Sequence, residues 1–182
     1  MARIPAVERR EDLAPEHRAA YDEIAASRRR VAGPFAMLLH SPEVARRAAH
    51  LGAYIRFEAT LDGKVRELAV LAAAREMDCR YEWAAHAAEA RRAGVREEAI
   101  AAIGSRAPAL SDDERPVVSY VQQLLREHRV DEPTFQALRA RFGVQGLVEL
   151  TATAGYYGMI ACVLNAFDVT PPPGADVLPE RA

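Results

Sequence analysis

Residues 61–95, LDGKVRELAVLAAAREMDCRYEWAAHAAEARRAGV, decide the fold class of this chain. Residues 68–74 are apolar on every side of the expected helix, as in a helix that is enclosed by others. Asp78 or Cys79 then begins a second helix, and Gly94 has the residue type that commonly follows a helix C-terminus. The stretch therefore predicts a helical hairpin at the centre of the molecule.

The pattern of apolar residues in the rest of the chain also predicts helices, and no stretch shows the sustained alternation of apolar and polar residues that is typical of a strand. We expect an all-α fold, a bundle of about seven to eight helices. Outside the hairpin the expected helices cover residues 15–30, 42–60, 95–104, 114–128, 132–142 and 146–167. Gly33 and Pro34 end the first helix and begin a loop. Ser111 and Glu114 have the spacing of a capping box.

Length and composition are those of one soluble globular domain. The chain has 182 residues, of which 50% are hydrophobic, and a formal net charge of −2, so its charge gives no indication of a nucleic-acid partner. We expect a single domain over residues 1–182, with a core at about 33–167. A proline-rich tail at 168–182 lacks a core-forming pattern.

The cysteine content and the first residues of the chain favour the cytoplasm. The sequence has 2 cysteines and begins without the apolar run of a signal peptide. The most apolar segment, residues 150–164, is only about 15 residues long, whereas a membrane span needs roughly 20. We therefore expect this segment to be a buried helix, and no membrane partner.

Cys79, Glu82 and His86 are spaced so that they share one face of the second helix of the hairpin. Glu82 and His86 can form a hydrogen bond that raises the imidazole pKa and fixes its tautomer, which makes them an acid–base pair. Small and apolar neighbours indicate that the pair is packed; the alternative is a solvated surface pair. The helix N-terminus favours a Cys79 thiolate but the Glu82 carboxylate disfavours it, and a simply packed cysteine is the alternative.

Glu67 adjoins the most apolar turn of the first helix of the hairpin. Burial there would raise the pKa of its carboxyl towards neutrality, where a general base or a proton relay works best. The alternative is a salt bridge to Lys64 or Arg66 at the helix edge. The spacing of Glu67, Glu82 and His86 matches no metal motif, so we expect no metal site.

Three segments carry a family resemblance: GPFAMLLHSPE (33–43), residues 61–95 and GLVELTATAGYYGMIACVLNAF (146–167). In their all-helical order they resemble the carboxymuconolactone decarboxylase and alkylhydroperoxidase D-like superfamily. The middle segment is the most specific. In order along it, the residues that match the proton-relay glutamate, the two redox cysteines and the histidine of the peroxidase branch are Glu67, Cys79, Glu82 and His86.

Glu82 is the departure from the peroxidase branch, where this position would be the cysteine that meets the peroxide. Attack by one thiolate and disulfide closure by the other therefore cannot run within this helix, and Cys162 could substitute only if folding brings it beside Cys79. The YEWAAH variant resembles the decarboxylase-like branch, which implies a lyase with cofactor-free acid–base chemistry on a small organic acid or lactone. His86, held by Glu82, would deliver or remove the proton, and Glu67 would relay it.

A small-molecule substrate of this kind needs a pocket and, for a carboxylate, a cation. The expected substrate contacts are Tyr81, Trp83, Phe35 and Arg56. The candidate cations are Arg56, Arg66 and Arg80. The resemblance also implies a homo-oligomer, a trimer or hexamer, and the helix over 146–167 carries more apolar surface than one small domain easily buries.

Two other functional classes stay open. The first is an antioxidant peroxidase of the alkylhydroperoxidase or peroxiredoxin type that uses Cys79. The second is a non-catalytic helical binding or assembly subunit. Against the second stands the Glu82 and His86 pair, because an imidazole and a carboxylate within an apolar stretch are costly to bury unless they are satisfied or used.

Overall fold

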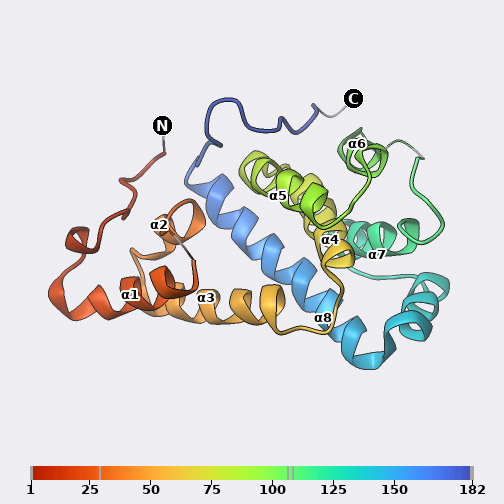
Figure 1. Cartoon of the computed structure of the whole chain (residues 1–182), viewed down its shortest axis with the longest axis horizontal. Helices are drawn as coiled ribbons and strands as arrows, with labels where there is room; N and C mark the ends of the chain where they lie inside the picture. The colour runs from red at the N-terminus through yellow and green to blue at the C-terminus, as the bar shows by residue number, and fades with distance from the viewer. Residues whose placement is uncertain (1, 29, 106, 108, 181–182) are drawn as a thin grey trace. The chain divides into compact units, whose positions relative to one another are not determined.

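The structure of the protein is a computed structural model that describes residues 2–28, 30–105, 107 and 109–180. In these ranges the regular structure is helical and contains no strand, which confirms the predicted all-α fold (Figure 1). The α-helices are α1 (Arg18–Ser27), α2 (Pro34–Leu38), α3 (Pro42–Phe57), α4 (Gly63–Glu76), α5 (Arg80–Arg92), α6 (Glu97–Ser105), α7 (Arg115–Glu127) and α8 (Glu132–Ala166).

The helices agree with the sequence prediction except at one segment. Residues 34–38 form the short helix α2 where the sequence predicts a loop, because Pro34 suits the first position of a helix and Gly33 adopts the positive φ of 58° that precedes it. Helix α8 is broken at Gly143, whose φ of 69° and ψ of −179° are non-helical and favour glycine. The two helices predicted over 132–142 and 146–167 are therefore confirmed, as two segments that meet at this break.

The chain divides into two compact units. The first unit comprises residues 1–58 and 162–170, and the second comprises residues 59–161 and 171–182. In the first unit α3 packs on α1, and Ile24, Leu39 and Ala45 are fully buried. The buried face of α3 is made largely of alanine, whose small side chain allows the helices to approach closely.

Helix α4 is the centre of the second unit, where it packs against α5, α6 and α7 (Figure 1). Residues 69–73 of this helix are completely shielded from solvent, which confirms the prediction that it is enclosed on every side. A side chain on α4 that carries a charge must therefore find its partner on a neighbouring helix.

The link between α4 and α5 is as short as two helices permit. The N–H of Cys79 donates to the carbonyl of Ala74 (2.8 Å) and the N–H of Asp78 to that of Arg75 (3.3 Å), which is a Schellman motif. Asp78 takes the left-handed conformation at φ 47°, a role usually filled by glycine. Helix α5 begins at Arg80, two residues after Asp78. The two helices therefore pack against each other along their length, and side chains of α4 and α5 meet between them.

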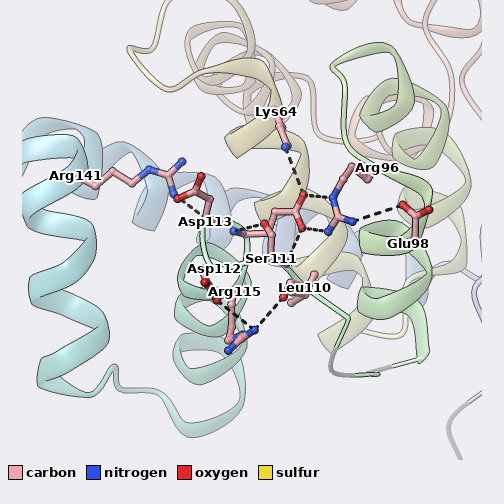
Figure 2. Close-up of polar contacts among 10 residues, drawn as sticks. Lys64, Arg96, Glu98, Leu110, Ser111, Asp112, Asp113, Arg115 and Arg141 are labelled. Carbon is pink, nitrogen blue, oxygen red and sulfur yellow. Dashed lines mark hydrogen bonds and ion pairs between the residues drawn. The ribbon is translucent and has the colours of Figure 1, made fainter.

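A buried carboxylate on α7 ties the beginnings of three helices together. Glu114 is 1% exposed and accepts hydrogen bonds from Arg96 (2.6 Å) and from the N–H of Ser111 (3.0 Å), while Lys64 lies 3.4 Å away (Figure 2). The hydroxyl of Ser111 accepts from the Glu114 N–H in return, which confirms the predicted capping box. Arg96 holds the pKa of this carboxyl down to about 2, with further help from the Ser111 bonds.

The C-terminal tail has no helix, yet it packs on the second unit. The guanidinium of Arg75 donates to the carbonyl of Pro179 (2.6 Å), and Asp176 pairs with Arg91 on α5 (2.8 Å). Leu178 is buried with an exposed fraction of 6%. The proline-rich composition predicts a segment without a core pattern, but three long-range contacts are enough to dock it.

Helix α8 alone among the described helices is long and apolar enough to cross a membrane, with an 18-residue window of mean hydropathy 1.4. Of that window 61% is buried inside the protein, as in the core helix of a soluble domain, so its length and composition are weak evidence for a span. Leu150, Ala154, Ala161 and Leu164 are at most 1% exposed, which confirms the prediction of a buried helix over 150–164.

Candidate functional site

The hairpin brings Glu67 on α4 against His86 on α5. Nδ1 of His86 lies 2.7 Å from Oε2 of Glu67, in a hydrogen bond that is buried. An ionised carboxylate can only accept, so Nδ1 carries the proton in this bond. The bond therefore fixes the tautomer of the imidazole and holds the ring at its Nδ1 atom.

Glu82 lies on the opposite side of the same ring. Its Oε2 is 3.4 Å from Nε2 of His86, one turn away on α5, as the spacing predicts. The side chains of Glu67, Glu82 and His86 are 4%, 5% and 8% exposed. The alternative of a solvated surface pair is therefore excluded, and a carboxylate faces each nitrogen of a buried imidazole.

The pKa of Glu67 differs from the sequence prediction. Burial raises this pKa, as expected. The hydrogen bond from His86, the charge of His86 and the interactions with Arg66 lower it, and together they outweigh burial, so the pKa of Glu67 lies below its ordinary value. Nε of Arg66 lies 3.4 Å from Oε1 of Glu67, so the alternative of a salt bridge at the helix edge is also present. Lys64 instead lies beside Glu114. Glu67 is thus an ionised partner of His86 and not a neutral acid.

A fourth side chain at this site comes from α8. The ring of Tyr157 meets the imidazole of His86 in a T-shaped arrangement, with centroids 4.9 Å apart and an interplanar angle of 84°. Tyr157 is 4% exposed. No pattern in the sequence predicts this contact, because an aromatic residue in the apolar run 150–164 has the pattern of any core residue.

Cys79 lies at the start of α5 and is fully buried. Among the described residues, neither this thiol nor that of the exposed Cys162 forms a disulfide. The residue is the N-cap of α5, yet its side chain makes no capping hydrogen bond. This burial fits the reading of a packed cysteine better than that of a thiolate that meets a peroxide.

The two aromatic residues of α5 that the sequence suggests as substrate contacts differ in environment. Tyr81 is half-buried. Trp83 is buried and packs on α6, so close to Gly104 that a methyl group there would lie 3.0 Å from Cη2 of the indole. Pro179 of the tail approaches the same glycine. Trp83 therefore holds α5, α6 and the tail together.

The other two suggested substrate contacts, Phe35 and Arg56, belong to the first unit. Phe35 is buried beneath the guanidinium of Arg28, which lies 3.9 Å from the ring centroid, and Arg56 lies 5.3 Å from the ring of Phe57. Of the candidate cations in the second unit, Arg66 adjoins Glu67, whereas Arg80 is exposed at the start of α5.

In the described part of the chain, no group of three or more histidine, cysteine, aspartate or glutamate side chains is arranged to hold a metal ion. The chemistry that the cluster itself offers is proton transfer. A proton that arrives at Nε2 of His86 from the side of Glu82 can leave from Nδ1 towards Glu67, so the imidazole connects the two carboxylates.

The comparisons with known proteins address the family and the fold of the chain. The model of the carboxymuconolactone decarboxylase family matches residues 42–115, which include Glu67, Cys79, Glu82 and His86. A search of curated proteins found no match.

Solved structures share the fold. An uncharacterized peroxidase-related protein with an alkylhydroperoxidase AhpD core, from Ralstonia eutropha JMP134, is 21% identical with a TM-score of 0.77, and 94% of this chain and 93% of that chain are covered. A peroxidase-related protein from Silicibacter sp. TM1040 is 16% identical with a TM-score of 0.73 and 93% coverage of both chains.

A third structure is that of a protein of unknown function from Agrobacterium tumefaciens, proposed as an antioxidant defence protein AhpD. It is 22% identical with a TM-score of 0.67, and 74% of this chain and 94% of that chain are covered. Likeness at this identity establishes the fold, and the family model covers the segment that holds the site. The chain therefore has the fold of these alkylhydroperoxidase D-like structures, and its residues 42–115 are similar to the carboxymuconolactone decarboxylase family.

Proposed function

We propose that the protein is a cofactor-free acid–base enzyme, a lyase of the carboxymuconolactone decarboxylase type that acts on a small organic acid or lactone. The observation that carries the proposal is the buried imidazole of His86 with one carboxylate at each nitrogen, Glu67 at 2.7 Å and Glu82 at 3.4 Å. Buried ionisable groups are costly, and a cluster of three is typical of a site that moves protons.

The two carboxylates have different roles in this proposal. Glu67 makes the short hydrogen bond, so it orients His86 and supports its positive charge, the task that the sequence assigns to Glu82. Glu82 occupies the position of the peroxide-reactive cysteine in the peroxidase branch, so it is the carboxylate on the side of the reacting atoms. His86 and Glu82 then exchange the proton with the substrate, and Glu67 relays it.

In a decarboxylation the carbon–carbon bond to the leaving carboxylate breaks and carbon dioxide departs. The electron pair passes into the unsaturated lactone carbonyl, so the substrate itself accepts the electrons. The imidazolium of His86 then donates a proton to carbon, and the site regains a proton from water. Arg66, half-buried beside Glu67, is the cation that can balance the negative charge of a carboxylate substrate.

The alternative function is an antioxidant peroxidase that uses Cys79. Two of the similar structures are peroxidase-related proteins, and a third is proposed as an antioxidant defence protein. Two observations count against it here: Cys79 is fully buried, and position 82 holds a carboxylate in place of a second thiol. A further alternative is a helical binding or assembly subunit without catalysis.

One experiment separates these functions. The purified protein is incubated with a panel of carboxylated lactones and β-keto acids, and the release of carbon dioxide is followed; in parallel, alkyl hydroperoxide is offered with a dithiol reductant. The proposal predicts turnover in the first assay that His86→Ala reduces by about 10²- to 10⁴-fold. Turnover of hydroperoxide alone, lost in Cys79→Ser, would establish the peroxidase instead, and failure in both assays would favour the binding subunit.

A cytoplasmic homo-oligomer, a trimer or hexamer, is part of the same proposal. Exposed apolar side chains gather on two helices: Val44, Leu51, Tyr54 and Phe57 on α3, and Val144, Val148 and Met159 on α8. Exposed apolar side chains gathered on one helix are typical of an interface with another chain, and each of the two helices carries such a set. Light scattering at micromolar concentration tests the proposal, and a monomer would contradict it.

A further inference from the structure

We infer that Tyr157 is a positioning residue for His86, a role that rests on the proposed acid–base function. The residue lies on α8, far from the hairpin in sequence, yet its ring meets the imidazole with centroids 4.9 Å apart and an interplanar angle of 84°. The contact is therefore one that the fold makes between α8 and α5.

The two carboxylates restrain His86 only at its nitrogen atoms. Glu67 fixes Nδ1 at 2.7 Å, whereas Glu82 stands further off, at 3.4 Å from Nε2. A ring held firmly at one nitrogen can still swing about that bond. Tyr157 packs against the ring itself, so it restricts this motion and keeps Nε2 directed at Glu82.

Tyr157 also excludes water from the imidazole. Its ring is 4% exposed, and it is held by a second T-shaped contact, with Tyr156 at a centroid distance of 5.3 Å and an angle of 87°. Tyr156, Tyr157 and His86 form a row of three rings in edge-to-face contact. This packing protects the proton that Nδ1 of His86 donates to Glu67 from exchange with solvent.

The test uses Tyr157→Met, which keeps most of the volume but removes the ring, and Tyr157→Phe, which keeps the ring. Tyr120→Met is the matched control, because Tyr120 is also 4% exposed and its hydroxyl bonds to Thr151 on α8. Nitrogen-15 NMR measures the exchange rate of the Nδ1 proton of His86 with solvent. Steady-state kinetics with the substrate found in the panel measures kcat and KM separately.

We expect Tyr157→Met to speed exchange of the Nδ1 proton by about tenfold. It should lower kcat by about threefold to tenfold with KM unchanged, because Tyr157 acts through His86. Tyr157→Phe and Tyr120→Met should both stay within about twofold of the wild type.

Equal exchange rates in Tyr157→Met and Tyr120→Met would overturn the inference, and so would a Tyr157→Phe variant that behaves like Tyr157→Met. If Tyr157→Met does not fold, the wild type decides: a Nδ1 proton that exchanges as fast as that of an exposed histidine would equally overturn it. The exchange rates do not depend on turnover, so a protein without lyase activity would refute the proposed function and leave this test intact.

Discussion

Nδ1 of His86 hydrogen-bonds to Oε2 of Glu67 at 2.7 Å, although the two residues are 19 positions apart and lie on different helices. The bond exists because the Schellman turn at Asp78 folds α5 back along α4. It also reverses the effect of burial on Glu67, whose carboxyl pKa lies below its ordinary value. The site is thus a buried carboxylate–imidazole hydrogen bond inside a helical hairpin, with a second carboxylate at the other nitrogen of the ring.

The first prediction concerns His86→Ala. Burial alone raises the pKa of Glu67, and the hydrogen bond and charge of His86 are the main causes that lower it. Without the imidazole, the Glu67 carboxyl should therefore titrate at a higher pH than in the wild type. Carbon-13 NMR of the side-chain carboxyls measures this, with Glu67→Gln to assign the signal. An unchanged titration of Glu67 would show that His86 does not set its charge state.

The second prediction concerns Glu82→Gln, which keeps the shape of the side chain and removes its charge. The imidazolium of His86 loses a partner 3.4 Å from Nε2, so His86 should titrate at a lower pH than in the wild type. If the activity needs protonated His86, the pH above which the activity declines should therefore be lower in Glu82→Gln than in the wild type. NMR titration of His86 and the pH profile of kcat/KM measure the two effects.

The double variant Glu82→Gln/His86→Ala tests whether the two side chains act together. If Glu82 and His86 act as a unit, Glu82→Gln with His86→Ala should be about as inactive as His86→Ala alone, because the effects of such groups are not additive. Additive losses would mean that the two side chains work independently, and Glu82 would lose its assigned role.

The third prediction concerns the thiols. Cys79 is fully buried, so Cys79→Ser should retain the lyase activity and cost about 1–2 kcal/mol of stability, because it places a more polar hydroxyl in a site shielded from solvent. Cys162→Ser is the control, since Cys162 is exposed and should tolerate the change. The assays are carbon dioxide release and urea unfolding. Hydroperoxide turnover that is lost in Cys79→Ser but kept in Cys162→Ser would instead favour the peroxidase.

The parts of the fold that could be predicted from the sequence are those fixed by local interactions. The enclosed α4 follows from its uninterrupted apolar run, the end of α5 from Gly94 at φ 82°, and the start of α7 from the capping box of Ser111 and Glu114. The i,i+4 approach of Glu82 to His86 is local in the same sense.

The rest depends on how the helices pack. Helical periodicity places Glu67 and His86 on their helices, but the 2.7 Å bond between them and the resulting sign of the Glu67 pKa shift require the turn at Asp78. Tyr157 belongs to an apolar run in which no pattern distinguishes a site residue from a core residue. The docked tail depends on Arg75 and Arg91, which meet it only after folding.

The fourth prediction tests the docked tail. Leu178 is 6% exposed, so Leu178→Ala should lower the free energy of unfolding by about 2 kcal/mol. The neighbouring Val177 is 82% exposed and provides the control, because Val177→Ala should change stability by less than about 0.5 kcal/mol. Urea unfolding followed by circular dichroism measures both. Equal stabilities of the two variants would show that the tail contributes nothing to the fold.

The last prediction concerns acid stability. Arg96 and Ser111 lower the pKa of Glu114 from 4.5 to about 2, and its side chain is 1% exposed. A carboxyl whose pKa is lower in the folded state stabilises the protein above the unfolded pKa, and this stabilisation is lost as the pH falls through the folded pKa. At about 1.4 kcal/mol for each pKa unit, Glu114 contributes about 3 kcal/mol at pH 7, and this contribution disappears between pH 4.5 and about 2.

Glu114→Gln should therefore be less stable than the wild type by about 2–3 kcal/mol at neutral pH, and the difference should shrink steadily as the pH falls below 4.5. Glu98→Gln is the matched control, because Glu98 contacts the same Arg96 at 3.6 Å but is 70% exposed, and exposed pairs contribute little. Urea unfolding at a series of pH values gives the free energy of unfolding as a function of pH for the wild type, Glu114→Gln and Glu98→Gln. Parallel curves for the wild type and Glu114→Gln would contradict the prediction, since they would mean that the Glu114 carboxylate does not link folding to proton binding.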